Sequence, residues 1–205
     1  STGSGPSARH SHALAWDAGR GVVVLFGGSS AGGSTDDETW EYDGTGWTQA
    51  APVASPPAGA MHSMAYDPGL GAVVLVGSGG LLGGDRTWLY DGVTWTESTG
   101  TNRPAARMGG RVAYHPERGR VVLFGGCGAL DVTSFTCTGV LWDTWEFDGA
   151  SWTMLGTPLS PDARWGHVMT YFESLQAVAV FGGESAMAVP RFETWIYRME
   201  SLWPA

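Results

Sequence analysis

Nearly the same stretch of sequence occurs four times in this chain of 205 residues. In each copy an apolar run ends at a glycine and a tryptophan follows, at Gly27/Trp40, Gly77/Trp88, Gly125/Trp145 and Gly182/Trp195. The marker glycines lie 50, 48 and 57 residues apart. A repeat of this length is one supersecondary unit, which must bury its faces against neighbouring units. The chain is therefore predicted to be one repeat domain over residues 1–205, with repeats near 6–50, 51–100, 101–155 and 156–205.

Each repeat is predicted to form four short antiparallel strands. In the first repeat these strands fall in HALAWD (12–17), GVVVLFGG (21–28), ETWEYDG (38–44) and GWTQA (46–50). The second strand is apolar at consecutive positions, which indicates burial on both faces. Asp-Gly pairs supply the positive φ of tight hairpin turns. Helical periodicity is absent, so we expect an all-β chain with essentially no helix.

The repeat is similar to the kelch repeat, in which an apolar strand ends in Gly-Gly and an aromatic residue and a spaced tryptophan follow. The glycine pairs are Gly27–Gly28, Gly125–Gly126 and Gly182–Gly183, with Gly77–Ser78 in the second repeat. The aromatic and tryptophan positions are Tyr42/Trp47, Tyr90/Trp95, Phe147/Trp152 and Tyr197/Trp203. The resemblance implies a β-propeller whose repeats are four-stranded blades, with the first strand of each blade innermost.

Four whole repeats are few for a propeller of this family, and no strand is set aside at either end to complete a shared blade. Large residues on the innermost strands would also compete for space in a four-bladed ring: Trp16, Tyr66, Tyr114 and Tyr171. We therefore expect a second copy of the chain, or a missing segment of a longer protein, to complete a ring of about eight blades.

The charge balance excludes two classes of partner. Net charge is −9, and all 11 basic residues are arginine. Nucleic acids and anionic membranes require clustered positive charge, which this sequence does not contain. No apolar run approaches the roughly 18 residues of a membrane span, and no signal peptide is visible.

Cys127 and Cys137 lie in the longest loop of the chain. No CxxC motif or neighbouring histidine accompanies them, so zinc is disfavoured, and a disulfide that closes the loop is predicted over two free thiols. A disulfide indicates an extracellular or periplasmic location. No metal and no cofactor is expected.

The long loops between strands two and three, and between consecutive repeats, share one end of the blades, where binding usually resides. The first strands begin at this end with two rows of equivalent residues: Arg9, Gly59, Arg107 and Arg164, then His12, His62, Gly110 and His167. These rows either tie blades together through backbone hydrogen bonds or line a mouth that binds a carboxylate, sulfate or acidic sugar. A metal site formed by the three histidines is a weaker alternative.

Aromatic residues in or beside the same loops are candidate contacts for sugar rings or for a protein partner: Phe135, Trp142, Trp165 and Phe192. Packing of each loop on its own blade is the alternative. The acidic run Asp36, Asp37 and Glu38 lacks the alternating ligand spacing of a calcium loop, so a solvated turn is expected.

No catalytic signature such as GxSxG or HExxH is present. The leading hypothesis is a non-catalytic recognition scaffold that binds a protein or carbohydrate, or an acidic ligand, outside the cytoplasm. Because the resemblance extends to sugar oxidases, epimerases and lyases, the second hypothesis is an enzyme acting on sugars or acidic polysaccharides. It would use an arginine at the mouth of the central channel, with His12 or His167 as acid or base. The third is an assembly subunit that completes a larger propeller.

Overall fold

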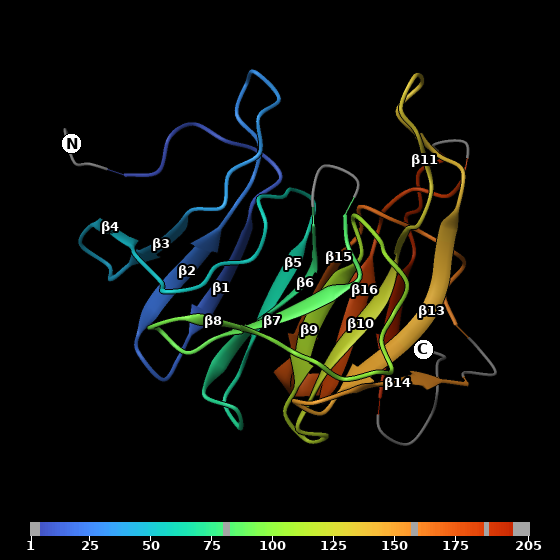
Figure 1. Ribbon diagram of the computed structural model, residues 1–205. Helices are drawn as coiled ribbons and strands as arrows, with labels where there is room; N and C mark the ends of the chain where they lie inside the picture. Colours follow the sequence, from blue (N-terminus) through green and yellow to red (C-terminus); the bar gives the residue numbers. More distant parts are fainter. Residues whose placement is uncertain (1–4, 80–82, 157–159, 187–188, 199–205) are drawn as a thin grey trace. The chain divides into compact units, whose positions relative to one another are not determined.

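The computed structural model describes residues 5–79, 83–156, 160–186 and 189–198. The chain divides into two compact units, Ser1–Ser98 and Thr99–Ala205. Within the described residues the only helical element is the 3-10 turn η1, Glu173–Leu175, and all other regular elements are β-strands (Figure 1). The predictions of an all-β fold and of essentially no helix are confirmed.

The first unit contains two antiparallel sheets, which we call blades 1 and 2. Each has four strands that pair in sequence order. Blade 1 consists of β1 (Ala13–Asp17), β2 (Val22–Phe26), β3 (Thr39–Tyr42) and β4 (Trp47–Ala50). Blade 2 consists of β5 (Ser63–Asp67), β6 (Ala72–Ser78), β7 (Arg86–Tyr90) and β8 (Trp95–Glu97).

The second unit contains blades 3 and 4. Blade 3 consists of β9 (Arg111–His115), β10 (Arg120–Cys127), β13 (Val140–Phe147) and β14 (Trp152–Leu155). Its long loop carries a small hairpin of β11 (Leu130–Asp131) and β12 (Thr136–Cys137). Blade 4 consists of β15 (Val168–Phe172), β16 (Ala177–Phe181) and β17 (Thr194–Tyr197). The fourth strand predicted near Trp203 lies outside the described residues.

The second strand of each blade forms the buried centre of its sheet. Every residue of β6 is buried, as is β10 beyond Arg120. The Asp-Gly turns also form as predicted: Gly44, Gly92 and Gly149 all adopt positive φ. In blade 1 the Asp43 carboxylate accepts hydrogen bonds from the backbone N–H groups of Thr45 and Gly46, at 2.8 and 3.0 Å. The local sequence thus encodes both the buried strands and their turns.

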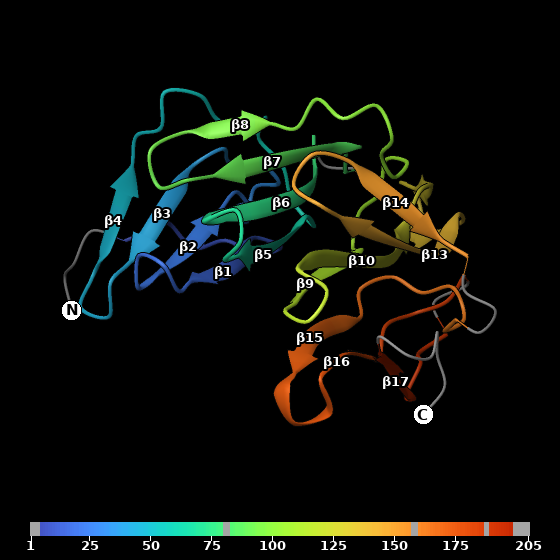
Figure 2. The same cartoon turned by 90° about the horizontal axis from the view of Figure 1, so that it is seen from below.

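Within each unit two blades pack face to face along their first strands. β1 lies beside β5, and β15 lies beside β9 (Figure 2). Apolar residues from both blades fill the space between them: Ala13, Ala15, Phe26, Met64 and Leu75 in the first unit, and Ala113, Phe124, Val178, Val180 and Tyr197 in the second. The sheets are thus blades of the β-propeller type, and each falls inside its predicted repeat. The single-domain organisation stays a prediction.

No helix in the described part of the chain is long and apolar enough to cross a membrane.

Candidate functional site

The predicted arginine row is buried and held by hydrogen bonds within each blade. In each of Arg9, Arg107 and Arg164, Nε donates to the carbonyl two residues earlier, at 3.0–3.1 Å. Nη1 donates to the carbonyl of the marker glycine, at 3.0–3.1 Å. Nη2 binds the carboxylate that directly precedes the threonine and marker tryptophan of the repeat, which is Glu38, Asp143 or Glu193. These contacts favour the structural interpretation of the row, with the bonds inside a blade rather than between blades.

In blade 2 both residues of this ion pair are replaced. Gly59 stands where the other blades have arginine, and Arg86 stands where they have the carboxylate. Arg86 turns to Glu97 on β8 instead, with 2.8 Å between Nη1 and Oε2. A carboxylate left at position 86 would have no arginine to bind, so the paired change avoids an uncompensated charge.

The acidic run in blade 1 belongs to this ion-pair network. Glu38 binds Arg9 Nη2 at 2.5 Å and accepts from Trp40 Nε1 at 2.9 Å, while Asp36 lies 3.5 Å from Arg9 Nη1. The sequence predicted a solvated turn here. The difference arises because Arg9 approaches from the segment that precedes the first strand, which is far from the run in sequence.

The histidine row, unlike the arginine row, lies at the junctions between blades. His62 of blade 2 is buried, and its Nε2 lies 2.9 Å from the Phe26 carbonyl oxygen of blade 1. His167 of blade 4 occupies the equivalent place, with its ring 5.5 Å from that of Phe124 in blade 3. Burial, together with the charges of Arg111 and Arg164, lowers the pKa of His167 to about 3. His167 is therefore a neutral packing group at ordinary pH.

His12, the equivalent residue of blade 1, is only half-buried. Partial burial and the neighbouring Arg9 and His10 charges lower its pKa. Within the described ranges, no three His, Cys, Asp or Glu side chains are grouped so as to hold a metal.

Backbone hydrogen bonds complete each junction in the same way in both units. The second glycine of the marker pair donates to the next blade, Gly28 to Gly59 O and Gly126 to Arg164 O, both at 2.9 Å. The next blade donates in return, Met61 to Ser11 O and Gly166 to Gly109 O, both at 2.8 Å. The four positions in this second set all adopt left-handed φ between 57° and 67°: Ser11, Met61, Gly109 and Gly166. We call this set of bonds, with the histidine, the junction clasp.

A glycine is required at the first marker position because the clasp brings another backbone close to it. A Cβ at Gly27 would lie 2.7 Å from Gly59 O, and one at Gly125 would lie 2.5 Å from Arg164 O. Both separations are shorter than real Cβ contacts allow. The glycine pair of the repeat is thus a junction feature.

Two predicted aromatic residues meet at a hollow on blade 4. Trp165 and Phe192 line a cavity of about 420 Å³, together with Phe181, Gly183 and Arg191. In blade 3 the equivalent region, beside Phe124 and Gly126, is covered by the Arg164–His167 segment of blade 4. The hollow therefore lies where a following blade would place the segment that precedes its first strand.

The other candidate surface is the long loop of blade 3, and the third predicted aromatic residue, Trp142, lies beside it on β13. A Cys127–Cys137 disulfide closes this loop, as predicted. The sequence does not predict the β11–β12 hairpin inside it, because this hairpin has only two residues a strand. Its tip is fixed by Asp131, which accepts from Thr133 N–H and from Ser134 Oγ, both at 2.9 Å. The β11–β12 hairpin projects from blade 3 (Figure 1). Phe135 is exposed on this hairpin, and Trp142 is exposed on β13, which follows it.

Reduction of the disulfide is expected to loosen this hairpin before the blades unfold. Closing a loop of this length contributes on the order of 2 kcal/mol by chain-entropy arguments. Limited proteolysis of the Cys127→Ser/Cys137→Ser variant should cut within residues 128–138 while the wild-type hairpin survives. Equal protection of the two proteins would contradict a stapling role.

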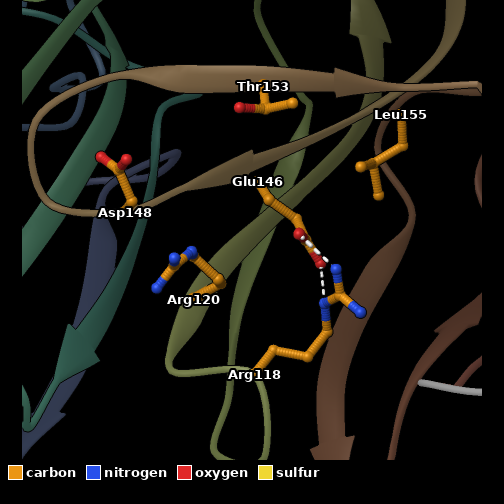
Figure 3. Close-up of a pocket in the computed structure, with 6 residues that line it drawn as sticks. All are labelled: Arg118, Arg120, Glu146, Asp148, Thr153 and Leu155. Carbon is orange, nitrogen blue, oxygen red and sulfur yellow. Dashed lines mark hydrogen bonds and ion pairs between the residues drawn. The ribbon is translucent and has the colours of Figure 1, made fainter.

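A further hollow lies at the opposite, short-turn end of blade 3. It measures about 490 Å³ and is lined by Arg118, Arg120, Glu146, Asp148, Thr153 and Leu155 (Figure 3). Arg118 and Glu146 are ion-paired to each other on one side. Glu146 also accepts from Tyr197 OH of blade 4 at 2.7 Å. The same arginine, glutamate and tyrosine recur in the first unit as Arg20, Glu41 and Tyr90, so the Arg118–Glu146 side of the hollow is a second junction contact.

The fold and junctions define an all-β chain of propeller blades. No family model matches the sequence, and no curated protein matches it.

Proposed function

We propose that the chain is a non-catalytic recognition scaffold whose binding element is the disulfide-closed loop of blade 3. The supporting observation is the exposure of Phe135, on a loop fixed by a covalent bond and by the Asp131 turn, and of Trp142 on the adjoining strand β13. Exposed aromatic side chains on a rigid element lose little entropy on binding and commonly anchor protein partners or stack on sugar rings. The partner is a protein or a glycan.

The contacts of the arginine and histidine rows give less support to an enzyme. Catalysis would need an arginine free to bind substrate, whereas each guanidinium in the row already binds two carbonyls and a carboxylate. His167 is buried and has a lowered pKa, so it is poorly suited to exchange protons with a substrate near neutral pH. The kelch resemblance and the extracellular or periplasmic location are part of the proposal, and the disulfide supports the latter.

The loop is tested with a Phe135→Ser/Trp142→Ser variant, probed on a glycan array and by photo-cross-linking with benzoylphenylalanine at position 135. Val53→Ser/Val93→Ser is the matched control, since it removes two other exposed apolar side chains. We expect the loop variant alone to lose glycan binding, or the cross-linker at 135 to capture a protein that the same probe at 93 does not. Identical results for wild type and loop variant in both assays would refute the proposal.

An assembly role is a second candidate. It is supported by exposed apolar side chains on two sheet faces, Leu14 and Trp16 on blade 1 and Val168 and Phe181 on blade 4.

A further inference from the structure

The outer face of blade 1 has the composition of a junction, and its large apolar side chains Leu14 and Trp16 are exposed. On β1, Ala13 and Ala15 pack toward blade 2, whereas Leu14 and Trp16 point the other way. Trp16 is 57% exposed. Met64, which is equivalent to Leu14, is buried where blade 2 meets blade 1. We call this surface the previous-blade face of blade 1.

Blade 4 exposes the complementary surface, its next-blade face. Phe181 ends β16 and is 49% exposed, whereas the equivalent Phe26 and Phe124 are 0% exposed because a following blade covers them. Val168, Phe172 and Leu175 extend the exposed apolar surface. Contiguous apolar patches of this kind mark interaction sites on soluble proteins.

Each of these faces also carries half of a junction clasp. Blade 4 offers the Gly183 N–H and the Gly166 carbonyl, and its glycines adopt the clasp conformation, with φ of 72° at Gly182 and 87° at Gly183. Blade 1 offers the Arg9 carbonyl, the Ser11 N–H and the His12 ring. None of the four backbone groups is hydrogen-bonded to another described residue.

Ser11 has the backbone conformation that the clasp uses on both sides of a junction. It holds a left-handed φ of 57°, which is unfavourable for a residue with a side chain. Met61 and Gly166 adopt the same conformation where they donate across a junction. The φ of Ser11 therefore matches both its own acceptor role toward Met61 and the donor role of Met61 and Gly166.

These two faces keep the residues that form the junctions inside each unit. Gly182, Gly183, Arg9 and His12 keep the repeat pattern, whereas blade 2 has Ser78 at the second glycine and blade 3 has Gly110 at the histidine. The polar junction contact is replaced on blade 4, where Leu175 and Ile196 stand in place of arginine and glutamate. Blade 2 shows the same exchange, with Leu70 and Leu89 at these positions.

We infer that the next-blade face of blade 4 docks on the previous-blade face of blade 1 of a second copy of this chain, through a junction clasp. The occupant is a second copy because each chain exposes both halves of the clasp, so two copies satisfy each other at two identical junctions. Pairing of the two halves within one chain would close a four-bladed ring, where the large first-strand residues such as Trp16 and Tyr114 compete for space. The bonds are Gly183 N–H to Arg9 O, Ser11 N–H to Gly166 O, and His12 to Phe181 O. This inference deepens the assembly role and is independent of the recognition loop.

The first test is the Gly182→Asn variant, measured by sedimentation of the full chain. Asparagine tolerates a left-handed φ, and a Cβ at this position meets nothing closer than Arg191 O at 3.7 Å within its own blade. Across the junction it would clash with the Arg9 carbonyl of the second copy, so the dissociation constant should rise at least about tenfold. Gly33→Asn is the matched control, with φ of 81° and no atom within 4 Å of the added Cβ.

A mixing experiment tests the head-to-tail geometry. Trp16→Glu blocks the previous-blade face, while Gly182→Asn blocks the next-blade face, so each variant alone should be monomeric. A mixture of the two retains one intact junction and should form a dimer with one chain of each kind. A monomeric wild-type chain, or variants that fail to associate when mixed, would overturn the inference. Circular dichroism confirms that each variant is folded, and Phe135→Ser/Trp142→Ser should leave association unchanged.

Discussion

Replacement of Arg107 by alanine is expected to lower the free energy of unfolding by about 3–5 kcal/mol, the range for breaking a buried ion pair. Only 2% of the Arg107 side chain is exposed, and it donates to Ala105 O, Gly125 O and both oxygens of Asp143 at 2.7–3.0 Å. The substitution leaves Asp143 and the two carbonyls without these partners.

Urea denaturation of Arg107→Ala, Asp143→Ala and the double variant measures this coupling. The free energy of unfolding should fall less in the double variant than the sum of the two single losses, because the double variant leaves no unpaired charge. Arg86→Ala is the control, since the Arg86–Glu97 pair is largely exposed and should contribute less than about 1 kcal/mol. If Arg107→Ala lowers the free energy of unfolding as little as Arg86→Ala does, the arginine row is not structural.

The second large effect is a pH dependence that originates at His167. Its pKa is about 3 in the folded protein against an ordinary value of 6.5, so the unfolded chain binds a proton that the folded chain does not. The stabilising effect of a neutral His167 is complete above pH 6.5 and is lost as the pH falls toward 3. Between pH 7 and pH 4 this amounts to about 3 kcal/mol.

The His167→Leu variant should therefore show a shallower fall in stability over this pH range than the wild type. Thermal melts at matched pH values give the slope, and the same substitution at the exposed His10 controls for a change of histidine content. Parallel pH profiles for wild type and His167→Leu would place the acid sensitivity elsewhere.

The sequence predicts the blades well because the signals that build them are local. An apolar run such as Val22–Phe26, followed by paired glycines and an Asp-Gly turn, encodes two strands and a hairpin within one repeat. The disulfide is predicted for the same reason, since both cysteines lie in one loop. The two-residue strands β11 and β12 escape detection because they are too short for any periodicity.

The role of the arginine row depends on contacts between residues distant in the chain. Arg107 and Asp143 are 36 positions apart, and no rule of local periodicity connects them. A usable signal is nevertheless present in the sequence, because the one repeat without the arginine is also the one without the acid. Alignment of the four repeats, position by position, is therefore sufficient to pair Arg9 with Glu38.

Blade 2 also shows how repeats of this kind diverge. A copy that lost only the arginine would keep a carboxylate facing carbonyl oxygens, and a copy that gained only Arg86 would place two cations together. Either single step is unfavourable, so the Gly59 and Arg86 exchange passes through a less stable intermediate whichever change occurs first. The residues at these two positions therefore depend on each other in each repeat. A blade transplanted into another propeller must carry the matching residues at both positions.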